Sequence, residues 1–167
     1  IYCIENSNLI TNDVTIMNNH SEDEAAGIYS SFSNLTLSGG SIGPNFGVDP
    51  EEASGIYSKN STVSLTGVEI KENPGSGLYL FKTTPVLNDI TVKNNDRHGV
   101  EIIQMPSNLP GNIISGDSEI YENGLSGIYL NNSDPIIDGL IIKDNDEGGI
   151  YMIHSDPTLS NVIIENN

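Results

Sequence analysis

The feature that most constrains this chain is an internal repeat. Its clearest copies are GIYSKNSTVSLTGVEIKENPGS (55–76), GLYLFKTTPVLNDITVKNNDRH (77–98) and GIYLNNSDPIIDGLIIKDNDEG (127–148), with a further copy from Gly149 and two longer copies at 27–54 and 99–126. Each of these copies starts with a glycine at the equivalent position. A period of about 22 residues is typical of solenoids, in which each repeat forms one coil of a continuous stack.

Each copy holds three short apolar runs, which predict three β-strands. In one copy these runs are 128–130, 135–137 and 140–142, and Asn, Asp, Gly and Pro separate them. Such runs are too short for helices, and their β-branched residues favour strands. One coil cannot bury its inward face alone, so coils stack and pair equivalent strands in parallel, with right-handed crossovers. The sequence therefore predicts an all-β fold: a right-handed parallel β-helix of about seven coils, forming a single domain over residues 1–167.

Strand alternation assigns inward and outward columns along this predicted rod. In the first run the inward column is Ile1, Ile28, Ile56, Leu78, Val100, Ile128 and Ile150, and the outward column is Tyr2, Tyr29, Tyr57, Tyr79, Glu101, Tyr129 and Tyr151. In the third run we expect Ile90, Val92, Leu140 and Ile142 to be fully buried. Cys3 falls in an inward column, which predicts a buried free thiol.

An asparagine column follows the third run at a constant offset. Its members are Asn73, Asn95, Asn123, Asn145 and Asn167, and Asn19 fits the same offset. Because Asn tolerates left-handed backbone, we expect that geometry at Asn95 and Asn145, with side-chain amides bonded between coils. With this column, nearly the whole chain resembles the right-handed parallel β-helix proteins, the pectate-lyase-like repeats with an asparagine ladder at one corner. The resemblance implies the fold and no particular activity, since this fold carries many.

Charge limits the partners of the chain. There are 6 Lys plus Arg against 23 Asp plus Glu, for a net charge of −17. This balance argues against nucleic acid and against anionic membrane surfaces. No apolar run is long enough to insert across a membrane. Few lysines and abundant Asn, Ser, Thr and Asp favour an extracellular or cell-surface protein. Since the chain begins and ends inside a repeat with no cap, we expect further coils end to end, of the same chain or of another copy.

Two acidic segments extend the first two coils after their third runs. They read HSEDEAA and GPNFGVDPEEAS and should lie side by side. The charged residues that would then meet are Glu22, Asp23, Glu24, Asp49, Glu51 and Glu52, with Glu22, Asp23, Asp49, Glu51 and Glu52 as the candidate metal ligands. One interpretation is a calcium site, since Ca²⁺ takes several carboxylate and carbonyl oxygens. The other is a solvated acidic loop, because the spaced aspartates of the common calcium loop are absent. No other cofactor is expected.

The outward tyrosine column allows two interpretations. Tyr57, Tyr79, Tyr129 and Tyr151 could form an aromatic strip that binds the sugar rings of a polysaccharide, or a ladder that stabilises the sheet. Glu101 replaces tyrosine in this column and is either a general acid or base, or a plain solvent-facing carboxylate. Residues expected near it are Lys82, Arg97, His98 and Gln104.

Other features add little chemistry. The clustered Asp, Gly-His-Gly and Arg-X-Lys motifs typical of hydrolases with this fold are absent, as are the motifs of the lyases. His20, His98 and His154 fall at different corners of the repeat and do not converge on a metal. Outward Ile136, Ile141 and Ile163 either mark a partner surface or lie under a neighbouring loop.

The sequence thus favours a non-catalytic extracellular scaffold: a surface protein, an adhesin stalk or a filament segment. The alternative is a carbohydrate-active module that binds polysaccharide, or a polysaccharide lyase or hydrolase with Glu101 as its acid.

Overall fold

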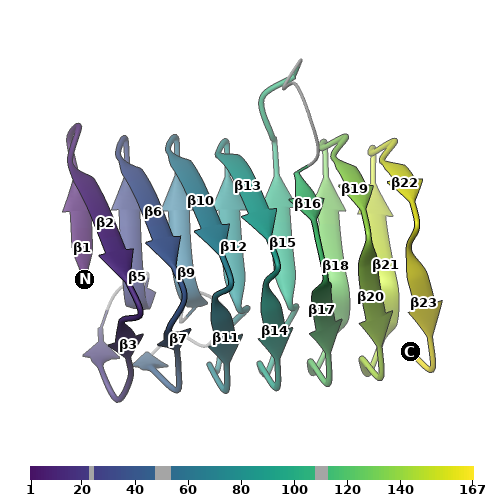
Figure 1. The fold of residues 1–167 in the computed structure, drawn as a ribbon, viewed down its shortest axis with the longest axis horizontal. Helices are drawn as coiled ribbons and strands as arrows, with labels where there is room; N and C mark the ends of the chain where they lie inside the picture. Colours follow the sequence, from purple (N-terminus) through teal and green to yellow (C-terminus); the bar gives the residue numbers. More distant parts are fainter. Residues whose placement is uncertain (23–24, 48–53, 108–112) are drawn as a thin grey trace.

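The computed structural model describes residues 1–22, 25–47, 54–107 and 113–167. Within these ranges the regular structure consists of β-strands alone. Figure 1 shows the coils stacked side by side into a rod, with the two ends of the chain at opposite ends of the stack. Neighbouring coils pair in parallel throughout. The predicted parallel β-helix with three strands per coil is therefore confirmed.

In the described part of the chain the rod has three sheets of seven strands each. The first sheet contains β1 (Tyr2–Ile4), β5 (Ala25–Ser31), β9 (Ser54–Lys59), β12 (Leu78–Phe81), β15 (Val100–Ile103), β18 (Ser126–Asn131) and β21 (Gly148–Ile153). The second contains β2 (Asn8–Asn12), β6 (Asn34–Ser38), β10 (Thr62–Thr66), β13 (Thr84–Asn88), β16 (Ile114–Ser115), β19 (Ile136–Asp138) and β22 (Thr158–Ser160). The third contains β3 (Thr15–Ile16), β7 (Ser41–Ile42), β11 (Glu69–Lys71), β14 (Thr91–Lys93), β17 (Ser118–Tyr121), β20 (Leu140–Lys143) and β23 (Ile163–Glu165).

The core follows the inward columns. Ile90, Val92, Leu140 and Ile142 are all 0% exposed, as the alternation predicts. Cys3 is a buried free thiol, as expected, and desolvation by burial raises its pKa. The three strands of each coil contribute only a few inward side chains. The core is therefore a narrow column that continues from coil to coil.

The corners turn through left-handed residues, but not at the positions expected. The backbone φ is 52° at Asn94 and 55° at Asp144, whereas Asn95 and Asn145 do not have positive φ. The expectation for Asn95 and Asn145 is therefore wrong by one residue. The physical reason is that two consecutive residues have different roles at each corner. The exposed residue takes the left-handed conformation and makes the turn, and the asparagine that follows it is buried beneath the corner.

A second corner, between the first and second sheets, carries a column of hydroxyl side chains. The Ser33 amide donates to Ser61 Oγ at 3.0 Å, and the Ser133 amide donates to Ser155 Oγ at 3.1 Å. These bonds satisfy backbone N–H groups that the turn removes from the sheets. Sequence analysis overlooked this column, although serine recurs at a fixed offset after the first run.

The two acidic segments begin next to each other. β4 (His20–Ser21) pairs in parallel with β8 (Phe46–Gly47), which confirms that both segments leave the rod side by side. Glu22 is exposed, while Asp23, Glu24, Asp49, Glu51 and Glu52 lie outside the described residues. Among the residues that are described, no three His, Cys, Asp or Glu side chains lie close enough to hold a metal ion. Calcium binding by these segments stays a prediction.

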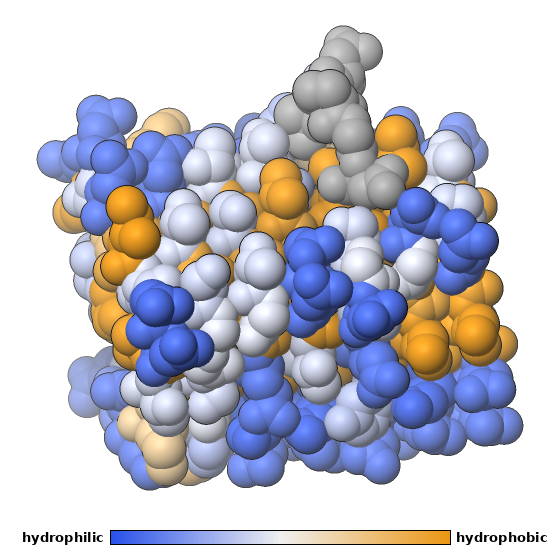
Figure 2. Space-filling view, in the orientation of Figure 1, coloured by the Kyte–Doolittle hydropathy of each residue, from blue (hydrophilic) through white to orange (hydrophobic). Residues whose placement is uncertain are grey.

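The outward isoleucines of the last coils are only partly covered. Ile136 and Ile141 are half-buried, and Ile163 is 51% exposed. Figure 2 shows hydrophobic surface over β20 and β23, near the C-terminal end of the rod. A neighbouring loop therefore does not cover the stripe at Ile163. Within the described ranges, no helix has the length and hydropathy needed to cross a bilayer.

Candidate functional site

The asparagine ladder runs along the corner between the third and first sheets. Side-chain amides donate from coil to coil over 2.7–3.4 Å in the order Asn19, Asn45, Asn73, Asn95, Asn123, Asn145 and Asn167. Asn95 Nδ2 also donates to the Lys93 carbonyl at 3.1 Å, and its Oδ1 accepts the Asn73 backbone N–H at 3.1 Å. Asn45 is a member that sequence analysis missed, although it follows Ile42 by the same three residues as Asn73 follows Ile70. The side-chain amides of the ladder thus bond to one another and to the backbone.

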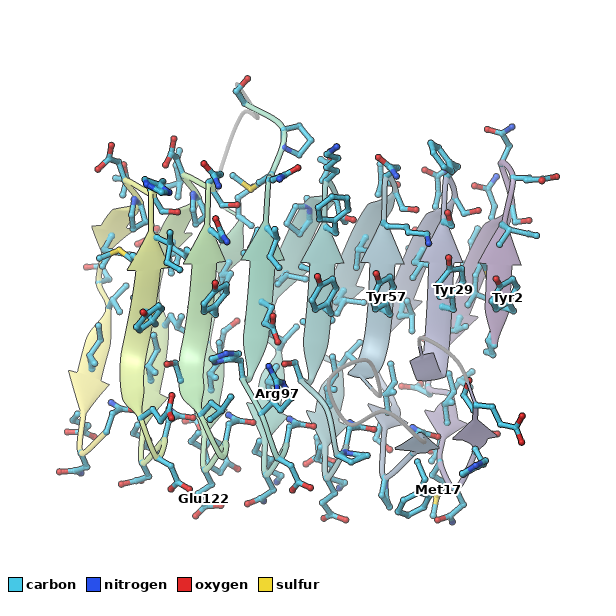
Figure 3. All side chains as sticks on the ribbon, turned by 180° about the vertical axis from the view of Figure 1, so that it is seen from behind. Tyr2, Met17, Tyr29, Tyr57, Arg97 and Glu122 are labelled. Atoms are coloured by element: carbon cyan, nitrogen blue, oxygen red, sulfur yellow. The ribbon has the colours of Figure 1, made fainter. Side chains whose placement is uncertain are left out.

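The tyrosine column of the first sheet forms a second ladder. Ring centroids lie 4.4 Å apart for Tyr2 and Tyr29, 5.6 Å for Tyr29 and Tyr57, and 4.7 Å for Tyr57 and Tyr79, with the planes within 11° of parallel. Figure 3 shows Tyr2, Tyr29 and Tyr57 in a row along the sheet. Because the rings stack along the rod, they cover one another's faces, and Tyr29, expected to face outward, is only 4% exposed. This geometry favours the stabilising ladder, and sugar binding by Tyr57, Tyr79, Tyr129 and Tyr151 stays a prediction.

Glu101 interrupts this ladder. On β15 it pairs with Tyr79 of β12 on one side and with Tyr129 of β18 on the other, so one rung has no ring. The side chain is only 6% exposed, so the interpretation of Glu101 as a solvent-facing carboxylate is wrong. The Ser76 hydroxyl donates a hydrogen bond to Glu101 Oε1. Alternation could place Glu101 on the outer face, but it could not show that neighbouring turns enclose it.

A pocket opens at the interrupted rung. Its volume is about 340 Å³, and it is lined by Tyr57, Tyr79, Arg97, His98, Glu101, Ile103 and Tyr129. Arg97 is the single arginine of the chain. It lies in the turn before β15, on the same side of the rod as the tyrosine row (Figure 3). The predicted neighbourhood of Glu101, Arg97 and His98 is therefore real, whereas Lys82 and Gln104 do not line this pocket.

His98 takes part in the aromatic wall. Its ring lies 5.0 Å from that of Tyr129 at a tilt of 33°, and the Ser126 backbone N–H donates to Nδ1 at 3.1 Å. Burial, together with the charge of Arg97, lowers the pKa of His98 to about 4. The imidazole is therefore neutral at pH 7, and because Nδ1 accepts a hydrogen bond, its proton is on Nε2. His20 and His154 are exposed and lie elsewhere.

The arrangement suits binding better than hydrolysis. Glycoside hydrolases generally use two carboxyl groups on either side of the bond that breaks. Among the residues that line this pocket, all in the described part of the chain, Glu101 is the single carboxylate. The pocket nevertheless combines an acceptor at Glu101, donors at Arg97 and His98, and aromatic walls. Such a set can hold a polar ring by hydrogen bonds and contact.

Comparison with known proteins identifies the family. A model of the right-handed β-helix region matches residues 53–167, which is more than half of the chain. No curated protein matches the chain significantly. The matched part covers the pocket, the interrupted rung and most of the asparagine ladder. With its stacked parallel sheets, the chain belongs to the right-handed β-helix family.

Proposed function

We propose that this chain is a rigid, non-catalytic scaffold of an extracellular or cell-surface protein, such as a surface protein, an adhesin stalk or a filament segment. The observation that carries the proposal is the asparagine ladder, which links each coil to the next from Asn19 to Asn167. An unbroken ladder over a continuous core resists bending between coils. The net charge of −17 supports the same role, because like charges oppose side-by-side clumping.

The scaffold role is tested by exposing the chain to a broad glycan array and to soluble polysaccharides, and by surface proteolysis of the cells that produce it. A chain that is a scaffold alone should give no glycan signal and no release of sugar, and should be cleaved on intact cells. Turnover of a polysaccharide that disappears in Glu101→Gln would contradict a non-catalytic role.

A second candidate is a carbohydrate-binding module, and the pocket beside Glu101 favours it. The pocket joins one carboxylate and two nitrogen donors to tyrosine walls, which is chemistry that sugar hydroxyls and sugar rings can use. Saturable binding without turnover, weakened in Tyr79→Ala, is the expected result. Binding that survives unchanged in Tyr79→Ala would remove the pocket from this candidate. A lyase or hydrolase is the variant of this candidate that Glu101→Gln tests.

We also propose that further coils pack on the ends of the rod, from the same longer chain or from another copy. The outermost strands of each sheet, such as β1 and β21, have one hydrogen-bonded neighbour, and Ile1 and Ile164 are about half exposed. Open strand edges beside apolar surface favour the addition of strands. Sedimentation of the 167-residue chain at rising concentration should show end-to-end species, and a well-ordered monomer at all concentrations would contradict assembly between copies.

A further inference from the structure

We propose that Asn123 is a site of spontaneous deamidation, and that the modification turns a transient opening of the rod into a permanent break. Asn123 and Gly124 form the single Asn-Gly pair of the chain. The pair lies inside the asparagine ladder, with Asn95 on one side and Asn145 on the other. The reaction needs no enzyme and no cofactor, because its reactants are a side-chain amide, the backbone nitrogen that follows it and water.

The chemistry follows from the order of atoms in the chain. The Gly124 nitrogen attacks Cγ of Asn123, and the new N–C bond closes a succinimide ring. The side-chain nitrogen leaves as ammonia, with the proton that the backbone nitrogen gives up. Water then opens the ring at one of its two carbonyls and leaves aspartate or isoaspartate. Glycine favours ring closure, because it has no Cβ to crowd the attacking nitrogen and its backbone is the least restricted.

The folded rod restrains both reacting groups. The Gly124 N–H donates to the Asn95 carbonyl at 2.9 Å, so the attacking nitrogen is tied to the preceding coil. Asn123 is 1% exposed, and its Oδ1 accepts from the side chain and the backbone N–H of Asn95 at 3.0 and 3.2 Å. Ring closure therefore requires that this coil opens, and the folded state slows the reaction.

The corner itself keeps glycine beside Asn123. A Cβ added to Gly124 would collide with the backbone carbonyl oxygen of Asp96 in the preceding coil. The close approach of the two backbones thus requires the residue that makes the asparagine reactive. The labile pair is therefore part of how this coil packs.

The product cannot take the place of the amide. Asn123 Nδ2 donates to Asn145 Oδ1 at 2.9 Å. It also donates to the Tyr121 and Val92 carbonyls at 3.0 and 3.3 Å. An ionised carboxylate has no hydrogen to donate, so it would turn a charged oxygen toward three acceptors at a buried position. Isoaspartate also adds one carbon to the main chain. A coil modified while it is open therefore does not restore the ladder.

The experiment unfolds the 167-residue chain in urea at mildly alkaline pH until part of it is deamidated. The sample is diluted to the highest urea concentration at which unmodified chain refolds, and protease resistance separates folded from unfolded molecules. Peptide mass spectrometry then measures the modified share of each asparagine. We expect Asn123 to react faster than any other ladder asparagine, and its modified form to be about 10-fold rarer in the folded fraction. No reaction at Asn123, or equal shares in the two fractions, would overturn the proposal.

A parallel sample and two matched variants complete the test. Folded chain kept at the same pH without urea should deamidate at Asn123 more slowly by about 10-fold or more. Asn123→Asp introduces the product and should lower the urea midpoint or prevent folding. Asn94→Asp makes the same change at the exposed left-handed corner, where Glu122 and Asp144 of other coils already place carboxylates, and should leave the midpoint unchanged. Equal rates with and without urea, or equal midpoints for the two variants, would contradict the proposal.

Discussion

The two ladders of the rod differ in one respect that organises its chemistry. The asparagine ladder continues through every coil, and each buried amide bonds to the next coil and to the backbone. The tyrosine ladder stacks in the same direction on the neighbouring sheet but lacks a ring at Glu101. The first column has no exception, and the second has one exception that coincides with a pocket.

The difference shows that the two columns of the repeat tolerate substitution to different degrees. A buried amide cannot be replaced without leaving the N–H and C=O groups of adjacent coils unpaired, so that column admits no change. An outward ring stacks on its neighbours from the outer face of the sheet, so one ring can be lost at a moderate cost. The outward column can therefore admit other side chains, and Glu101 is the one position of the first sheet's column where the tyrosine is replaced.

The largest expected effect is at the unbroken ladder. Asn95→Ala removes the amide that bonds to Asn73, Asn123 and the Lys93 carbonyl, and leaves buried polar groups unsatisfied. We expect the free energy of unfolding in urea to fall by about 3–4 kcal/mol. Asn94→Gly is the matched control: it changes the exposed left-handed residue beside it and should be neutral or slightly stabilising. Equal losses in the two variants would contradict the ladder as the source of stability.

The next effect is a pH dependence that comes from the pocket. The folded protein keeps His98 neutral down to its pKa of about 4, whereas the unfolded chain takes up the proton near the ordinary value of 6.5. Between these values the unfolded state binds more protons, so stability falls as pH drops from 6.5 toward 4, by about 2–3 kcal/mol in total.

Urea unfolding at a series of pH values measures this step as the difference between the wild type and His98→Asn. The asparagine can still accept the Ser126 N–H, and the step should be absent in this variant. His154→Asn should keep it, because His154 is exposed. A wild type and a His98→Asn variant with parallel pH profiles would show that His98 titrates normally and is not enclosed.

The smallest of the structural effects lies in the tyrosine ladder itself. Tyr57 is half-buried and stacks on Tyr29 and Tyr79, so Tyr57→Leu loses two aromatic contacts while it keeps much of its apolar area. We expect a loss of about 1 kcal/mol in thermal or urea unfolding. Tyr151→Leu, which loses one contact at a residue 54% exposed, should cost about half as much. A Tyr57→Leu loss as large as that of Asn95→Ala would erase the contrast between the ladders.

Much of this architecture is readable from the sequence because every coil repeats the same offsets. The inward columns, the parallel stacking and most of the asparagine ladder follow from alternation and from the fixed distance to the third run. The predicted position of the left-handed residue is wrong by one: it is Asn94 and not Asn95. Both residues are asparagines, and either one tolerates that backbone geometry. Sequence alone does not decide which of two neighbouring asparagines turns the corner and which one points inward.

The pocket was only partly predictable, for a related reason. Strand alternation predicts that Glu101 lies in the tyrosine column, and the short distance in sequence predicts that Arg97 and His98 lie near it. Their burial was not predictable, because both residues lie in a turn, where no periodicity fixes the direction of a side chain. The stacking of the rings was likewise hidden: the column of tyrosines is visible in the sequence, but the orientation of their faces is a property of the packed sheet.

The central claim is that the unbroken column holds the fold, whereas the interrupted rung is not needed for it. The most direct test is the free energy of unfolding of Glu101→Gln, measured in urea beside Asn95→Ala. Glutamine keeps the size of the side chain and can still accept from Ser76, so we predict a change within about 1 kcal/mol of the wild type, well below the loss in Asn95→Ala. A loss in Glu101→Gln as large as that in Asn95→Ala would show that the interrupted rung is a structural element, and would contradict the claim.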